Sequence, residues 1–345
     1  MSIERVTNIR DILKESGMTS VRRLRETQST DDFPLLFADV IERQILRGYQ
    51  MVDATWEDYI HVTTVPDFRN VSRRRITGLE GTLSRVEELA GYPVGSVDEE
   101  EFVYSVLKYG NTFGISWEAI VNDDMNALRD TPLRFGRSAR RTEYRMATQL
   151  FADPALRGAG EFFENGRNAI IAGGANLDPD NLATLYTMMK RTVDTDGEPI
   201  FNQPKYLVVG PALELTARNI LSSTIIREIL DANDEVEGER VNYWGQILEL
   251  RVNHYMPFID ETATSDTSWY LFADPADIRA IEVGRLRGHE QPDLFMKAPD
   301  ATPIGAGAAD AWAGSFENDD LRFKVRHVIG GTQIDWRGAF MSDGV

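Results

Sequence analysis

The spacing of apolar residues predicts several helices along the chain. Apolar positions three and four apart occur over residues 2–16, 32–50, 133–152 and 178–194, and the last of these opens with Asp178 as a capping residue before a proline. Ser116 and Glu118 predict a further helix from about 117 to 130. It should stop before Pro132, because a proline ring disfavours helical geometry at the preceding residue.

Alternation of apolar and polar residues predicts strands in the remaining segments. The stretches that alternate are 59–68, 101–110, 205–209, 244–256, 268–275 and 321–340. Helical and strand patterns alternate between about 165 and 275. We therefore expect a fold with both helices and strands, of the α+β class.

Residues 67–112 are predicted to form a long β-hairpin with a block of charge in each arm. The basic block and the acidic block consist of Arg73, Arg74 and Arg75, and of Asp98, Glu99, Glu100 and Glu101. Arms of roughly twenty residues would reach about 65 Å. A two-stranded ribbon is marginal alone in water, so we expect it to lie on a neighbouring subunit, with an ordinary solvated excursion as the alternative. The opposed blocks would pair within the hairpin or between subunits.

The helix expected at 133–152 has two distinct faces. One carries apolar side chains, and the other carries a stripe of guanidinium groups made by Arg134, Arg137, Arg141 and Arg145. A stripe of this kind could contact packaged DNA or the acidic side chains of a neighbouring subunit. An ordinary solvated helix face is an equally good interpretation.

Composition narrows the class of protein. The 345 residues carry a formal net charge of −18, which argues against a nucleic-acid binder that depends on an overall basic surface. There is no cysteine, which excludes disulfides, thiolate nucleophiles and cysteine-ligated zinc. With no long apolar run and no apolar leader segment, we expect a soluble protein made in the cytoplasm and no membrane partner.

The most acidic helical segment does not have the spacing of a catalytic or metal site. Glu118 and Asp123 are five positions apart and Asp124 is adjacent, so their carboxylates would not converge on a helix, and no histidine lies within fifty residues. The four histidines show no ligand spacing, and "GAGAAD" lacks the third glycine of a dinucleotide loop. We therefore expect no catalytic, cofactor-binding or metal-binding residues, and a building block in preference to an enzyme. A carboxylate-dependent hydrolase stays as an alternative.

The order of several segments resembles the major capsid proteins of tailed bacteriophages. These segments are "DFPLLFADVIERQ", "VPDFRNVSRRRI", "VLKYGNTFGISWEAIVNDDMNAL", "FGRSARRTE", "PKYLVVGPALELTARNIL", "ADPADIRAIEVGRLRGHEQP" and "KVRHVIGGTQIDWRGAF". The resemblance is to the Hong Kong 97 type, and within it to the Mu-like head subunits. It covers about residues 33–340.

The resemblance implies a division of the chain into named parts. It implies an N-terminal arm and first helix at 1–50, an extended E-loop hairpin region at 51–115 and the P-domain spine helix at 116–164. An A-domain would follow at 165–275, and the P-domain strands with the C-terminal segment at 276–345. Such subunits form hexamers and pentamers of an icosahedral head that encloses double-stranded DNA.

The same resemblance implies partners and a location. We expect a homo-oligomeric shell in the virion, assembled in the host cytoplasm, with packaged DNA held non-specifically. A separate scaffold and protease, a portal protein and a decoration protein would be further partners. Some members crosslink a loop lysine to a neighbour's asparagine, but none of the six lysines here lies near the expected hairpin tip, so we expect no crosslink. The alternatives are an encapsulin-like compartment shell, and a tail or decoration protein.

Overall fold

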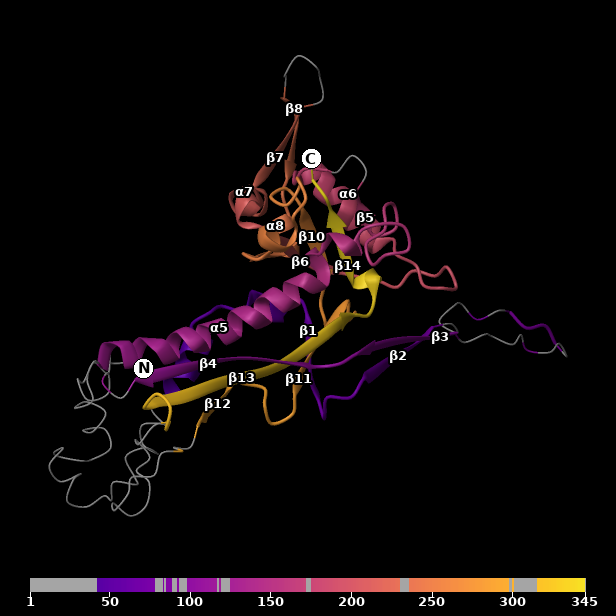
Figure 1. Ribbon diagram of the computed structural model, residues 1–345. Coiled ribbons are helices and arrows are strands. Elements are labelled where there is room, and N and C mark those ends of the chain that lie inside the picture. Colours follow the sequence, from indigo (N-terminus) through magenta and orange to yellow (C-terminus); the bar gives the residue numbers. More distant parts are fainter. Residues whose placement is uncertain are drawn as a thin grey trace, which may run out of the picture. The chain divides into compact units, whose positions relative to one another are not determined.

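The chain is a mixed helix-and-strand protein with two compact units. The computed structural model describes residues 42–77, 83, 85–88, 92, 98–116, 118, 125–171, 175–229, 236–297, 300 and 315–344. The first unit contains the described parts of 1–52, 109–139 and 291–327, and the second those of 53–108, 140–290 and 328–345. Helix α5 (Met125–Ala152) and strands β4 (Leu107–Ser116) and β13 (Asp320–Gln333) contribute to both (Figure 1).

The first unit packs helices on strands. β12 (Asp293–Met296) pairs antiparallel with the first part of β13, and β4 pairs with β13 as well. Phe113 of β4 stacks on Phe135 of α5 and on Phe323 of β13, with ring centroids 4.6 and 5.1 Å apart. Residues 42–50 are helical, and Ile45 of this helix is buried in the same cluster. The helix expected at 32–50 is therefore confirmed over 42–50, and the helix expected at 2–16 lies outside the described residues.

The larger sheet of the second unit has five strands in the order β5-β14-β10-β6-β9. Its strands are β5 (Ala169–Ile170), β6 (Pro204–Val209), β9 (Glu249–Val252), β10 (Trp269–Ala273) and β14 (Ala339–Ser342). β10 pairs antiparallel with both β6 and β14, while β5 and β9 pair parallel at the edges.

Both faces of this sheet are buried, as the unbroken apolar run of β10 requires. On one face, Leu207 and Leu271 pack with helices α6 (Pro179–Lys190) and α7 (Glu214–Ser222). On the other, Phe272 packs with Tyr59 and with Phe151 near the end of α5. The expected helix 178–194 is confirmed as α6, and the Asp178 carboxylate caps it by accepting from two backbone N–H groups.

The second unit also contains two smaller sets of strands. β1 (His61–Val65) pairs parallel with β11 (Ile281–Leu286), which pairs antiparallel with the second part of β13. β2 (Val71–Thr77) and β3 (Asp98–Tyr104) form a two-stranded ribbon, and β7 (Ile225–Ile229) and β8 (Val236–Val241) form another (Figure 1). The short elements are η1 (Thr55–Asp58), η2 (Pro154–Leu156), η3 (Pro211–Leu213), α8 (Trp244–Ile247), α9 (Met256–Ile259) and η4 (Trp336–Gly338).

The structure corrects three sequence predictions. α5 runs through Pro132 without the expected break, because the burial of one face of the helix offsets a proline cost of roughly 3 kcal/mol. Ser116 is the last residue of β4, so it does not cap the helix expected from 117; Glu118 is helical, and 119–124 lie outside the described residues. The predicted strand over 244–256 is in fact α8, the short strand β9 and the start of α9.

Candidate assembly surfaces

The β2–β3 ribbon is the most distinctive candidate surface, because no further strand pairs with it among the described residues. Its register joins Val71 to Tyr104 and Thr77 to Asp98, so each strand contributes seven residues. At about 3.4 Å per residue the paired length is about 24 Å. Residues 78–97, mostly outside the described part, contain the rest of the expected hairpin. β4, which the hairpin prediction included, pairs with β13 instead.

One face of the ribbon lies on the rest of the second unit. Val71 and Tyr104 pack with Val65, Leu286 and Val328. The Arg73 Nε donates to Glu282 Oε1 at 2.6 Å, and the Tyr104 hydroxyl donates to the same oxygen at 2.7 Å. Glu282 belongs to β11 and is 1% exposed. Burial and the hydrogen bond to Glu282 raise the pKa of Tyr104, so this hydroxyl stays a donor at neutral pH.

The basic block and the acidic block lie opposite each other in the ribbon, but they form only part of their ion pairs with each other. Arg74 lies opposite Glu101, with a nitrogen–oxygen distance of 4.0 Å between side chains that are both half exposed or more. Such a pair contributes about 0–1 kcal/mol. Arg75 lies opposite Glu100 at 3.6 Å, yet its closer partner is Asp335 at 2.8 Å. Arg73 and Arg75 of the basic block therefore bind mainly Glu282 and Asp335, which lie outside the ribbon.

The other face of the ribbon is exposed. It carries Ser72, Arg74 and Ile76 from β2, with Glu99, Glu101 and Val103 from β3, and Ile76 and Val103 are 62% and 48% exposed. Apolar side chains beside charges on an unpaired ribbon are the features of a surface that another chain covers.

The four arginines of the predicted stripe all lie on α5. Arg134, Arg141 and Arg145 are exposed, and Arg137 is partly exposed and donates to Met51 Sδ at 3.6 Å. Within the described part of the chain, no acid lies within 4 Å of any of the four guanidinium groups, whereas most other arginines of that part have an acid partner. Among the described residues the stripe is therefore a surface of positive charge without acid partners, about 17 Å long at 1.5 Å per residue.

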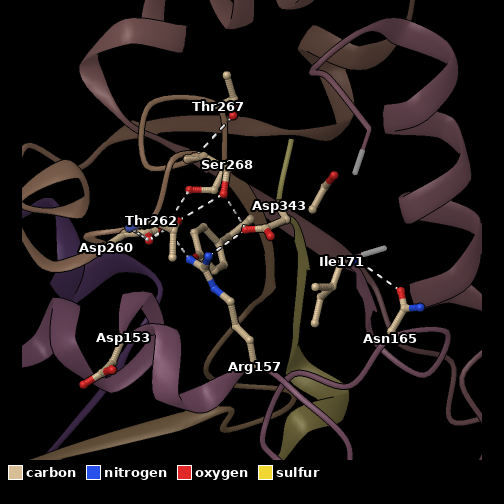
Figure 2. Close-up of polar contacts among 12 residues, drawn as sticks. Asp153, Arg157, Asn165, Ile171, Asp260, Thr262, Thr267, Ser268 and Asp343 are labelled. Atoms are coloured by element: carbon tan, nitrogen blue, oxygen red, sulfur yellow. Dashed lines mark hydrogen bonds and ion pairs between the residues drawn. The ribbon is translucent and has the colours of Figure 1, made fainter. Parts of the chain in front are cut away.

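A buried polar network holds the end of the chain to the larger sheet (Figure 2). The Arg157 guanidinium donates to Asp343 at 2.6 Å, to Asp260 at 2.5 Å and to the Tyr270 hydroxyl at 2.9 Å. Burial raises the pKa of Tyr270 to about 12, against the opposing charge of Arg157. The Thr262 hydroxyl donates to Asp260 as well. The network satisfies buried charges and so maintains the fold of the second unit.

Sequence reasoning missed the acids that hold the ribbon. Glu282 and Asp335 are 209 and 260 positions from the arginines they bind, so no local pattern could pair them. A weak signal existed, since Glu282 is a single charge within the otherwise apolar stretch "AIEVG". Charged residues are almost never fully buried unless they are paired.

The described residues form no catalytic or metal-binding cluster from the acids and histidines considered in the sequence. Glu118 is exposed, and Asp123 and Asp124 lie outside the described part. No group of three or more histidine, aspartate or glutamate side chains in that part could hold a metal ion. Burial and the nearby Arg279 lower the pKa of His61, which favours its neutral form. None of the described helices is both long enough and apolar enough to cross a bilayer.

Several solved structures have a similar fold, among them two phage capsids and a virus-like particle. The capsid structure of the cyanophage P-SCSP1u is 13% identical, with a TM-score of 0.50 over 83% of this chain and 86% of the other. The capsid of the myovirus phage XM1 is 11% identical, with a TM-score of 0.48 over 83% and 90%. A virus-like particle from Pyrococcus furiosus is 12% identical, with a TM-score of 0.45 over 88% and 98%. The fold of this chain is thus similar to that of the cyanophage P-SCSP1u capsid structure.

The family follows from a comparison with family models. Residues 99–342 match the model of the phage capsid protein family, and the chain belongs to that family. It is therefore a structural component of a virion capsid and not an enzyme. Comparison with curated proteins gives no match.

Proposed function

We propose that this chain is the major head subunit of a tailed bacteriophage, of the Hong Kong 97 type and its Mu-like subgroup. In this proposal it forms hexamers and pentamers that close into an icosahedral head around double-stranded DNA. The observation that carries the proposal is the β2–β3 ribbon, with one face bound by buried contacts and the other exposed and unpaired. Family membership supports it independently.

The parts of such a subunit map onto the chain as expectations from the resemblance. The ribbon corresponds to the E-loop, α5 to the spine helix and the larger sheet with α6 and α7 to the A-domain. The exposed ribbon face, together with Arg74, Glu99 and Glu101, would lie on an adjacent copy. Ribbons of two strands gain stability only when something covers them. Scaffold, protease, portal and decoration proteins would act as separate chains.

Electron microscopy of the purified protein, alone and coexpressed with its neighbouring genes, tests the proposal. Closed isometric shells are expected. Tubes, or late binding to preformed shells, would indicate a tail or decoration protein instead. Shells that enclose a coexpressed enzyme and take up no DNA would favour an encapsulin-like compartment.

The ribbon can be tested separately through its register. Because Thr77 and Asp98 are directly paired, a two-residue Asn-Gly turn can replace residues 78–97 without changing the register of β2 and β3. The shortened chain should fold with an unchanged melting temperature and form no shells. In the control chain, residues 78–97 are replaced by a sequence of the same length that is rich in Asn and Gly. This control keeps the length of the segment but changes its side chains. Normal shells from the shortened chain would contradict the role of the ribbon.

We further propose that the α5 stripe contacts the phosphates of packaged DNA without sequence preference. Four guanidinium groups without acid partners in the described part of the chain suit a polyanion, since released counterions then favour binding. Changing all four arginines to glutamine should leave shell assembly intact and make filled heads lose DNA more readily. The matched lysine variant, which retains the charge, should behave like the natural chain. If the glutamine variant fails to form empty shells, the stripe binds a neighbour's acids; if nothing changes, it is a solvated face.

A further inference from the structure

The root of the β2–β3 ribbon converges on one buried carboxylate. Glu282 accepts a hydrogen bond from one residue of each strand, Arg73 of β2 at 2.6 Å and Tyr104 of β3 at 2.7 Å. In the ribbon register Arg73 lies opposite Phe102 and Tyr104 lies opposite Val71, so the two donors are diagonal neighbours on one face. A single acid of β11 therefore fixes both strands at once.

The backbone beneath Tyr104 is shaped to admit it. Gly284 lies two residues after Glu282, and side chains two apart in a strand share a face. A Cβ at Gly284 would stand 2.7 Å from the Tyr104 hydroxyl and 2.9 Å from its Cε2. The ring thus lies against the glycine, and its hydroxyl reaches Glu282. Any side chain at 284 would displace the ring and break that hydrogen bond.

A second tie on the same face restricts the tilt of the ribbon. Arg75 binds Asp335 at 2.8 Å, and it lies two residues beyond Arg73, about 7 Å further along the strand. The ion pairs of Arg73 and Arg75, with the apolar contact of Val71, fix the direction of the ribbon. A single contact would leave the ribbon free to rotate about that point. A change of 10° at the root would move the far end of the paired strands by about 4 Å.

We infer that Glu282 is a positioning residue for assembly, because its bonds to Arg73 and Tyr104 set the direction in which the ribbon leaves the second unit. This inference rests on the proposed function of the chain as a shell subunit. The ribbon can cover an adjacent copy only if it points at it. Loss of the Glu282 contacts therefore produces a folded subunit with a misdirected ribbon.

The test is the isosteric variant Glu282→Gln, with Asp260→Asn as its matched control. Both remove the charge of a carboxylate that is 1% exposed and bound to an arginine of the second unit, but only Glu282 touches the ribbon. Hydrogen exchange of the unassembled chains should accelerate at least tenfold in β2 and β3 for Glu282→Gln, and not in these strands for Asp260→Asn. The yield of closed shells, counted by electron microscopy, should fall at least tenfold for Glu282→Gln alone.

Several outcomes overturn the inference. It fails if Glu282→Gln gives shells of normal yield and diameter, or if Asp260→Asn loses shells to the same extent at an equal fall in melting temperature. If Glu282→Gln does not fold, Tyr104→Phe removes one of the two hydrogen bonds and should show the same localised exchange with a smaller loss of shells. Unchanged exchange in β2 and β3 of that variant contradicts the positioning role of Glu282. Exchange is measured on single chains, so it reports on Glu282 even if the natural chain forms no shells and the proposed function itself fails.

Discussion

The contact between the helix at 42–50 and α5 permits a quantitative test, because a glycine allows the two backbones to touch. A Cβ added at Gly136 would lie 2.0 Å from the carbonyl oxygen of Ile45 and 2.8 Å from the backbone nitrogen of Tyr49. Both are main-chain atoms, so no side chain can rotate away. Ordinary contact begins at about 3.4 Å, and the helices must therefore separate locally by about 1.4 Å.

The magnitude follows from two opposing effects of Gly136→Ala. Alanine is favoured over glycine within a helix by about 1 kcal/mol, which alone would stabilise the chain. Separation of the helices loosens the buried Ile45 and Tyr49, and overpacking of this kind costs about 1–3 kcal/mol or more. A gap of even 1 Å forfeits up to about half of each dispersion contact. We expect a net loss of about 1–2 kcal/mol in the free energy of unfolding.

Denaturant unfolding of the unassembled chain measures this loss, with Gln149→Ala as the control on an exposed position of the same helix. The control should change the free energy of unfolding by less than about 0.5 kcal/mol. A Gly136→Ala chain that is as stable as the natural one, or more stable, would refute the close approach of the two helices.

Three further predictions concern charge and covalent chemistry. Burial raises the pKa of Asp335 from its ordinary value of 3.8 to about 6, with Arg75 opposing and Glu100 adding to the effect, so the folded chain holds this proton more tightly than the unfolded chain. Through this group the free energy of unfolding should fall as pH rises from 3.8 to about 6, and Asp335→Asn should remove that part of a measured pH profile; an unchanged profile contradicts it. Arg157→Gln leaves the buried Asp260 without its cation and should cost about 3–5 kcal/mol in denaturant unfolding, and a loss below 1 kcal/mol would show the network to be dispensable. Mature particles boiled in detergent should release monomer, since no lysine lies near the expected hairpin tip, and a ladder of covalent multimers on a gel would disprove this.

Local patterns in the sequence were sufficient where one element could be formed by its own residues. The apolar spacing of Leu182, Leu185 and Met189 with the cap at Asp178 predicts α6 as observed. The run at 205–209 likewise predicts β6. Periodicity and capping are properties of neighbouring residues, and the helix or strand that they favour is decided within a few turns.

The same local rules failed where packing outweighed them. Pro132 predicts the end of a helix, yet α5 continues through it, and Pro132 and the described residues that follow it share one buried face. The stretch 244–256 alternates like a strand, but its first residues form the helical turn α8. Gly245 has no Cβ and packs directly against the carbonyl oxygen of Leu221. Propensity is a weak preference that tertiary contacts exceed.

The sequence by itself determined the class of fold, the family resemblance, and the existence of a ribbon with opposed charges at 73–75 and 98–101. Only the tertiary structure decided which acids those arginines bind. Arg73, which lies opposite Phe102, binds Glu282, and Arg75 lies closer to Asp335 than to Glu100 directly across the ribbon. A buried carboxylate needs a cation more than an exposed one does. That choice depends on burial, which arises only when strands far apart in the chain are brought together.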